Sequence, residues 1–243
     1  MKTRLAAILL SALVASLHTA CFNKPDAPML SGGSGSGSGS GTDVDAPLAR
    51  CGASDTFDTG ASACGTWGTL VGNGMLRKNG HLEALPFLVA VSTASTSCVT
   101  AQPFNFQNGA SIEIVNGIDT QMSGDAWFAV YSGAGSDAGI KVDLNTTTGT
   151  KALHVTCVGS TTLPVDPPYD AAAHRWWRFT VSGSNVTILN GPDASSLTTY
   201  GLCPWSLSTA TAFAEIGASI AGGDATGSAV FDNFNTINCP PAN

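Results

Sequence analysis

The sequence predicts an all-β protein built as a two-sheet antiparallel sandwich. Short apolar runs recur from residue 51 onward, and clusters of Gly, Ser, Asn and Asp separate them. Several of these runs alternate apolar and polar residues with the two-residue period of a half-buried strand. No window shows an apolar helical stripe of about ten residues or more, which excludes a helical bundle and a coiled coil.

The expected strands follow one another at short spacing. In chain order they are 67–72, 80–84, 87–93, 97–101, 110–116, 126–132, 139–144, 151–158, 174–182, 185–190, 212–220 and 227–236. The alternation is clear where Ile112 and Ile114 flank Glu113, and turn residues such as Thr148-Gly149 separate neighbouring runs. About twelve strands over about 190 residues fit a sandwich of two sheets.

The composition excludes one large class of function. Charged residues make up 11% of the chain, against roughly 25% in an average soluble domain, and Gly contributes 28 residues. These values are typical of an extracellular β-protein. The formal net charge of −7, with only 10 Lys and Arg, would repel phosphate, so nucleic acid is not an expected partner.

The first twenty residues resemble a bacterial lipoprotein signal peptide. Lys2 and Arg4 precede an apolar run over 5–17, which is shorter than the about 20 residues that a spanning helix needs. His18-Thr19-Ala20-Cys21 resembles a lipobox, although His18 stands where an aliphatic residue is usual. We expect lipidation at Cys21 and a membrane partner through that anchor. The alternative is an ordinary signal peptide in which Cys21 is incidental.

A flexible tether follows the predicted anchor. The Gly/Ser repeat over 31–42 has no apolar periodicity and behaves as a random coil. Phe22 after the cysteine, in place of Asp, favours the outer membrane of a Gram-negative bacterium. The expected domains are therefore a signal peptide over 1–20, a lipidated cysteine and tether over 21–49, and one sandwich domain over 50–243.

The cysteines of the predicted domain indicate disulfides. An even number of cysteines in an exported domain favours pairing, and no C-x-x-C or zinc spacing occurs. The sequence does not decide the connectivity, although Cys239 could pair with Cys51 or Cys64 if the ends of the domain lie on neighbouring strands. The disulfide candidates are Cys51, Cys64, Cys98, Cys157, Cys203 and Cys239.

Three stretches resemble the concanavalin A-like (laminin-G-like) jelly-roll superfamily of secreted bacterial proteins. They are 55–58 with Trp67 downstream, 169–179 with a hairpin and 191–193 after it, and the closing run 229–234. The resemblance implies a curved two-sheet jelly roll with a concave face. Its members include lectins, glycan-binding modules, glycoside hydrolases and adhesion domains, so the fold does not decide the function.

The residues that carry catalysis in the hydrolases of this superfamily are only partly present. Laminarinase-like members carry Glu-x-Asp-x-x-Glu on one strand, because a nucleophile and an acid must lie close together. The nearest segment here, 111–116, holds only Glu113, and Glu215 lies on another expected strand. No G-x-S-x-G, nucleotide-binding or H-E-x-x-H motif occurs. We therefore expect that the chain is not an enzyme, with a diverged glycoside hydrolase as the alternative.

Strand alternation selects candidate glycan contacts. On 174–181 it directs Trp177 and Phe179 to the core and leaves Trp176 and Arg178 outward, where a ring could stack on a sugar and a guanidinium could bind hydroxyls or carboxylates. The same argument leaves other side chains outward on neighbouring strands. The ligand-binding candidates are Trp176, Arg178, Trp127, Tyr131, His154 and Glu113. The simpler interpretations are scaffold for the tryptophans, a hydrogen-bonded strand residue for His154, and an arginine ion pair for Glu113.

The resemblance also implies a structural Ca²⁺ where the first loop meets the last strand. Asp55, Asp58 and Asp232 occupy the matching places, and Ca²⁺ requires several oxygen ligands. The alternative is that these residues only form turns.

These observations together predict an extracytoplasmic, lipid-anchored binding module for a glycan or another cell-surface ligand. Two alternatives stay open: a diverged glycoside hydrolase, and a structural or adhesion lipoprotein whose partner is an envelope protein.

Overall fold

The computed structural model describes residues 53–87, 93–133, 139–157, 163, 167–206 and 208–236. The predicted signal peptide, Cys21, the tether and the start of the domain at residue 50 lie outside the described residues, as do Cys51 and Cys239. Within this part the regular elements are strands, one single-turn 3₁₀ helix, η2 (Phe106–Asn108), and no α-helix. No helix of the described residues is long and apolar enough to cross a membrane.

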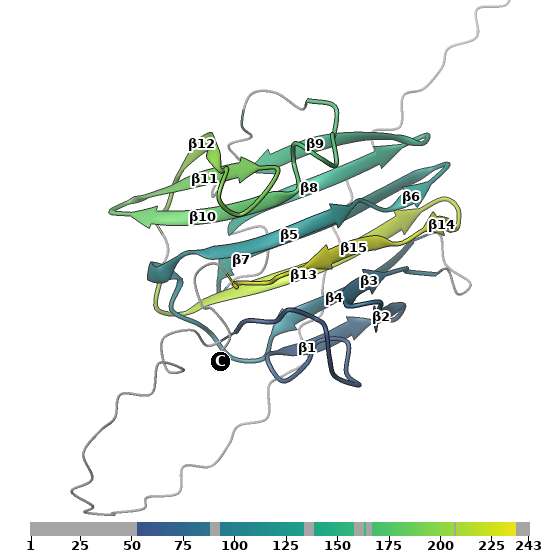
Figure 1. Ribbon diagram of the computed structural model, residues 1–243, viewed down its shortest axis with the longest axis horizontal. Coiled ribbons are helices and arrows are strands. Elements are labelled where there is room, and N and C mark those ends of the chain that lie inside the picture. The colour runs from purple at the N-terminus through teal and green to yellow at the C-terminus, as the bar shows by residue number, and fades with distance from the viewer. Residues whose placement is uncertain are drawn as a thin grey trace, which may run out of the picture. The chain divides into compact units, whose positions relative to one another are not determined.

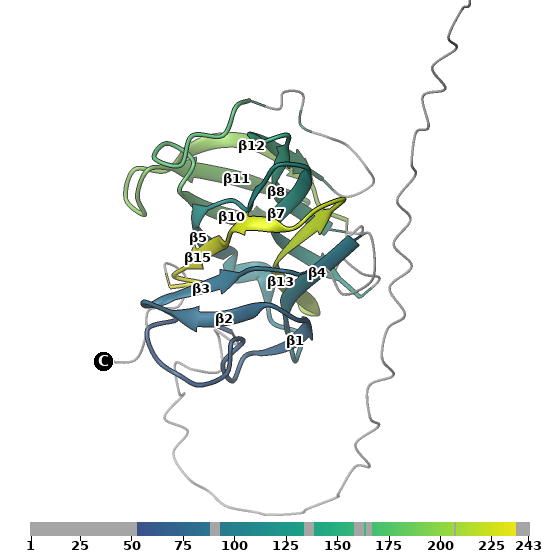
Figure 2. The same ribbon diagram turned by 90° about the vertical axis from the view of Figure 1, so that its right-hand side faces the viewer.

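Two large antiparallel sheets form the fold, which confirms the predicted sandwich (Figure 1). Both are seen edge-on as two layers in Figure 2. In order across the sheet, the six-stranded sheet consists of β1 (Gly68–Gly72), β4 (Thr93–Thr100), β13 (Ala212–Ala221), β7 (Ser123–Ser132), β8 (Gly139–Thr147) and β9 (Thr150–Thr156).

The second layer is a seven-stranded sheet. Its order is β12 (Thr198–Pro204), β11 (Asn185–Gly191), β10 (Trp176–Ser182), β5 (Ala110–Asn116), β15 (Ala229–Asp232), β3 (His81–Ala84) and β2 (Met75–Lys78). A short ribbon of β6 (Asp119–Thr120) and β14 (Ala225–Gly227) pairs separately. The central strands β5 and β15 are therefore neighbours although one comes early in the domain and the other closes it.

The core lies between the two sheets and follows the alternation of the sequence. Phe128 of β7 and Phe179 of β10 stack with ring centroids 5.1 Å apart, so they join the two layers directly. Trp177 is fully buried, and its indole Nε1 donates to the carbonyl of His174 at 2.9 Å. That bond satisfies the polar group that burial of the ring would otherwise leave unpaired.

Two-residue turns set the register of two hairpins. Asn79-Gly80 joins β2 to β3 and Thr148-Gly149 joins β8 to β9, and all four residues have positive φ. Positive φ at both central residues defines the type I′ turn, whose twist matches that of the paired strands. The predicted turn at Thr148-Gly149 is thus confirmed.

Some expected strands differ from the observed ones. The strands β2 and β12 were not predicted, because they lie at the edges of the sheet and are largely exposed, so their residues show no clear apolar alternation. The run 227–236 forms β14 and β15 instead of one strand. Phe87 lies outside any strand, and only Thr93 of the expected strand 87–93 belongs to a described strand, β4.

Two disulfides between described residues stabilise the sandwich. Cys64 pairs with Cys98 on β4, and Cys157, directly after β9, pairs with Cys203 on β12. The second bond joins an edge strand of one sheet to the end of an edge strand of the other. The alternative in which Cys64 pairs with Cys239 is therefore wrong. The two disulfides indicate an oxidising, extracytoplasmic environment.

Candidate functional site

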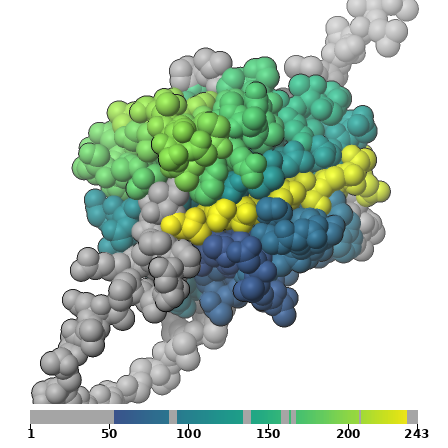
Figure 3. Space-filling view, in the orientation of Figure 1, coloured from purple at the N-terminus to yellow at the C-terminus, as the bar shows by residue number. Residues whose placement is uncertain are grey.

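The outer face of the seven-stranded sheet carries the most distinctive polar residues of the described chain. On β5, Ile112 and Ile114 point into the core, so Glu113 points to the outer face. On β10, Trp177 and Phe179 are fully buried in the core, so Trp176 and Arg178 point outward, as the alternation predicted. Figure 3 shows this side of the molecule, with a yellow band of C-terminal residues between green and blue surfaces.

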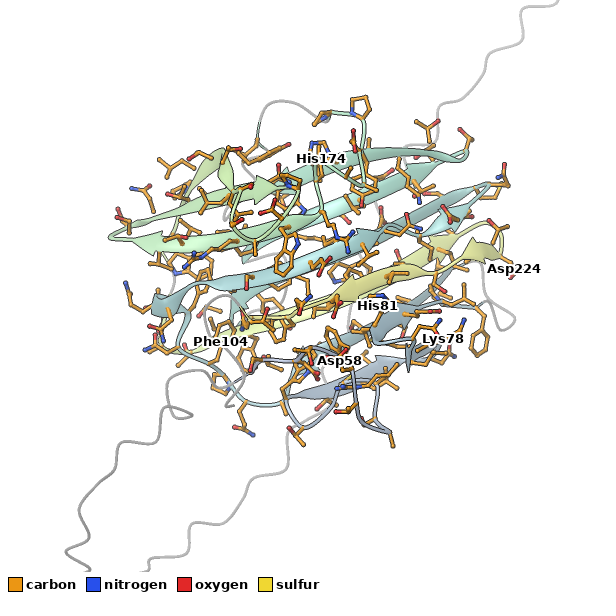
Figure 4. All side chains as sticks on the ribbon, viewed as in Figure 1. Asp58, Lys78, His81, Phe104, His174 and Asp224 are labelled. Atoms are coloured by element: carbon orange, nitrogen blue, oxygen red, sulfur yellow. A yellow bond between two sulfur atoms is a disulfide. The ribbon has the colours of Figure 1, made fainter. Side chains whose placement is uncertain are left out.

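Strand register aligns four side chains across this face. Trp176 of β10 pairs with Glu113 of β5, and Glu113 pairs on its other side with Asp232 of β15. On β3, His81 comes next, with its Nδ1 3.1 Å from the Asp232 Oδ2. We call Trp176, Glu113, Asp232 and His81 the carboxylate row. Figure 4 shows His81 near the middle of the face, with Lys78 beside it.

Glu113 is buried and held from two sides. Arg175 forms an ion pair with its Oε1, and the Asn233 Nδ2 donates to its Oε2 at 2.6 Å. Asn233 has a φ of 49°, a left-handed conformation that Asn tolerates better than most residues, and it directs the amide toward Glu113. The alternative in which Glu113 pairs with an arginine is confirmed. The alternation over 174–181 put Arg175 on the core-facing side with Trp177, and this expectation is wrong, since β10 begins at Trp176 and Arg175 pairs with Glu113. Asn233 was expected only beside the predicted calcium ligand Asp232, and its contact with Glu113 depends on chain segments meeting in space.

Asp232 differs in its surroundings from Glu113. Partial burial raises the pKa of Asp232, and the nearby Glu113 raises it further, while the Asn233 amide and His81 oppose the shift. Because directly opposite residues of antiparallel strands have Cβ atoms about 4.5–5.5 Å apart, the side chains of Glu113 and Asp232 are neighbours on this face. The row thus combines a carboxylate in an ion pair with a carboxyl group that retains its proton to higher pH.

A second pair of outward side chains lies beside the row. Arg178 of β10 pairs in register with Ser111 of β5. Ser111 is fully buried, and its hydroxyl has no hydrogen-bond partner among the described residues. The buried Nε of Arg178 also has no partner in that part of the chain.

Three other ligand-binding candidates lie on the opposite layer. Trp127 and Tyr131 of β7 point away from the core, as expected, but β7 belongs to the six-stranded sheet, as does the β9 strand that carries His154. Trp127 is only 8% exposed and Tyr131 only 9%. The Lys141 Nζ lies 5.0 Å from the Trp127 ring centre. The structure therefore does not bring these residues together with Trp176. Little of the Trp127 or Tyr131 ring is exposed for stacking on a sugar.

The polar residues of that layer form their own network. Lys141 Nζ lies 2.7 Å from the Asp143 Oδ2, and Asp143 stands in register between Trp127 and His154. Burial raises the pKa of Asp143 to about 6, although Lys141 opposes the shift. Burial, with the charge of Glu215, also raises the pKa of Tyr131.

The three aspartates predicted to bind calcium do not gather. Asp55 accepts from Trp67 Nε1 at 2.8 Å and from the Phe57 amide at 2.7 Å, and it forms an ion pair with Arg77. Asp232 faces His81, and Asp58 is exposed. Across the described ranges, no group of three or more His, Cys, Asp or Glu residues could hold a metal ion. Calcium binding stays a prediction, and the three aspartates named for it do not form one site.

Comparison with solved structures identifies the fold. A β-1,3-glucanase from Mycobacterium marinum superposes with a TM-score of 0.54 at 14% identity, over 74% of this chain and 96% of that one. The fold is the concanavalin A-like jelly roll. A glycosyl hydrolase family 16 protein from Mycobacterium smegmatis gives 0.54 at 14% identity, over 74% and 97% of the two chains.

A third jelly-roll neighbour comes from work on endo-acting O-glycanases of the human gut microbiota. It has a TM-score of 0.55 at 8% identity, over 74% of this chain and 96% of that one. No protein-family model matches the sequence, and no curated protein matches it. At these identities the likeness establishes the jelly-roll fold and leaves the activity to the residues of this chain.

The expectation that the chain is not an enzyme is corrected by these findings. Several proteins with this jelly-roll fold are glucanases or glycoside hydrolases. The sequence argument counted carboxylates along one strand, 111–116, and found only Glu113. The folded sheet places Asp232 of a different strand directly opposite it. A count along one strand therefore could not exclude catalysis.

Proposed function

We propose that this protein binds a glycan across the outer face of its seven-stranded sheet, at the carboxylate row. The observation that carries the proposal is the register that places Glu113 between Trp176 and Asp232. A partly exposed tryptophan beside hydrogen-bonding groups suits a sugar, because the ring stacks on C–H groups and the polar groups bind hydroxyls. The jelly-roll neighbours described as glucanases support a glycan as the ligand class.

A second candidate function is hydrolysis of the bound glycan, and the Glu113–Asp232 pair favours it. Retaining glycosidases use two carboxyl groups about 5–5.5 Å apart, one as acid and one as nucleophile. Asp232, with its raised pKa, would donate its proton to the glycosidic oxygen as the C–O bond breaks, and the Glu113 carboxylate would form the glycosyl ester. Water would then cleave the ester and return a proton to Asp232.

This arrangement differs from the one-strand motif of laminarinase-like hydrolases. Ser111 and Asn116 stand where that motif has its two glutamates, and here the second carboxyl group comes from β15. The proposed pair therefore differs from that motif, because its two carboxyl groups come from two neighbouring strands.

The test is a panel of β-glucans, xylans and mucin O-glycans, assayed for binding and for the release of reducing ends. We expect Trp176→Ala to abolish binding, and Glu113→Gln and Asp232→Asn to abolish release while binding is retained. The matched control is Glu215→Gln, which changes the same residue type on the six-stranded sheet. Binding that survives Trp176→Ala in a folded protein would contradict the proposed face.

We also propose that the mature protein is held on the outer membrane by lipid at Cys21. Support comes from the signal-like run over 5–17 and the lipobox-like 18–21. Labelling with a radioactive or clickable palmitate should mark the wild type and not Cys21→Ser. Equal labelling of both would contradict the anchor.

A further inference from the structure

The arginines of the described chain differ in how their charge is matched. Arg77 forms an ion pair with Asp55 and also donates to the Thr59 and Ser62 carbonyls. Arg175 forms an ion pair with Glu113. Arg178, in contrast, has no ion pair and no hydrogen bond within the ranges that the structure describes, and its Nε is buried.

The other charges on the outer face are already matched. Glu113 faces Arg175, Asp232 faces His81, and the Lys78 Nζ lies 3.5 Å from the Glu83 Oε2. These three carboxylates therefore each have a basic partner. Arg178 contributes the positive charge that these pairs do not neutralise.

The immediate neighbours of Arg178 give its guanidinium no charged partner. In register it lies between Ser111 of β5 and Leu189 of β11, and neither is charged. The Ser111 hydroxyl is fully buried and also has no partner in the described chain. A buried donor without an acceptor is costly, and more so when it is charged, so the fold holds the Arg178 guanidinium here without a partner that would offset this cost.

We propose that Arg178 binds the oxyanion of an acidic sugar next to the carboxylate row, so that the ligand is an anionic glycan. This inference rests on the proposed function, and it adds the chemical class of the ligand. The planar guanidinium binds a carboxylate through two parallel hydrogen bonds, which suits a uronic acid, and a sulfate ester presents the same acceptors. Trp176, two residues earlier on the same face of β10, would stack on the adjoining sugar.

The experiment compares acidic polysaccharides with neutral counterparts of the same backbone. The mature protein is titrated with polygalacturonate, alginate and hyaluronan, and with each after carboxyl reduction. Dextran sulfate and dextran form a further pair, which tests a sulfate ester in place of a carboxylate. We expect the acidic member of at least one pair to bind at least about tenfold more tightly than its neutral counterpart, because charge-assisted hydrogen bonds contribute that much.

Variants assign the preference to this residue. Arg178→Gln should weaken binding to the acidic member by about tenfold, to the level of the neutral member, and so abolish the preference. Arg178→Lys should restore part of the preference, because it returns the charge without the bidentate geometry. Unfolding curves of both variants establish that the fold is retained. If Arg178→Gln does not fold, wild-type titrations in rising salt replace it, and the preference must then decrease.

The outcomes separate this inference from the function on which it rests. Tight binding to both members of each pair would retain the glycan site and overturn the acidic ligand. A preference that persists in Arg178→Gln would overturn the assignment to Arg178. Failure to bind any member, with the neutral glycan panel also negative, would overturn the proposed function itself.

Discussion

Asp232 of β15 lies directly opposite Glu113 of β5, on the outer face of the seven-stranded sheet. The two carboxyl groups come from strands far apart in the sequence, and a bulge between Val230 and Phe231 sets the register that pairs them. Bulges often occur beside active sites, where they direct a side chain. The juxtaposition of these two residues is the basis of the proposed chemistry.

The two carboxyl groups should be individually essential for hydrolysis. Glu113→Gln removes the nucleophile and Asp232→Asn removes the acid, so each should reduce kcat by at least about 10²-fold. The measurement is reducing-end release at saturating glycan. Residual activity that Glu113→Gln and the matched control Glu215→Gln share equally would argue against the pair.

The pH dependence of hydrolysis should follow Asp232. Burial and the charge of Glu113 raise its pKa, so its protonated form persists to higher pH and the rate should decrease as the pH rises through that value. The charge of His81 lowers the same pKa. His81→Asn should therefore shift the basic limb of the pH–rate profile to higher pH. An unshifted limb would exclude Asp232 as the group responsible.

Asp143 should make stability depend on pH in the opposite sense to a typical salt-bridged carboxylate. Its folded pKa is raised from 3.8 to about 6, so the folded state binds more protons than the unfolded state between these values. The stabilisation from this group is therefore complete below about pH 4 and is lost as the pH rises through about 6, by on the order of 3 kcal/mol.

The check on Asp143 is a difference curve. Urea unfolding of the wild type and of Asp143→Asn from pH 4 to pH 7.5 should show the variant gaining relative stability as the pH rises. Lys141→Met should extend the loss of stability to higher pH in the protein that retains Asp143, because Lys141 lowers this pKa. A constant difference between wild type and Asp143→Asn would be the contrary result.

The ion pair between Asp55 and Arg77 should contribute strongly to stability. Their side chains are only 13% and 9% exposed, and Asp55 also accepts from Trp67. Asp55→Ala would leave a largely buried arginine without its partner and should cost about 3–5 kcal/mol. The control is exposed Asp58→Asn, which should change the free energy of unfolding by less than about 0.5 kcal/mol. Similar effects of the two substitutions would show that the pair is unimportant.

The disulfide between Cys157 and Cys203 should also contribute measurably to the free energy of unfolding. It closes a separation of 46 residues, for which loop entropy predicts about 4 kcal/mol. The double substitution Cys157→Ser/Cys203→Ser should lower the denaturant midpoint accordingly. Because the dependence on loop length is logarithmic, removing Cys64–Cys98, with a separation of 34, should cost nearly the same. No change in the midpoint would mean that the reduced chain retains equivalent constraints.

Much of the local structure followed from the sequence. Alternation predicted which side chains of 110–116 and 176–182 enter the core, because a strand directs successive residues to opposite faces whatever its neighbours are. It also predicted that Trp176 and Arg178 point outward, and a local turn signal predicted the hairpin at Thr148-Gly149. These properties depend on residues that are close in the chain.

Only the tertiary structure decided which outward residues meet. Trp127 and Trp176 both point away from the core, yet they lie on different sheets, because sheet membership depends on pairing between distant strands. Asp232 was predicted as a calcium ligand beside Asp55 and was found beside Glu113, since register alone brings β15 against β5. By itself the sequence determined the β-rich architecture and, for the strands with clear alternation, which side chains point to the core. The strand order and register determined the carboxylate row, because its four residues come from four strands that the chain does not visit in spatial order.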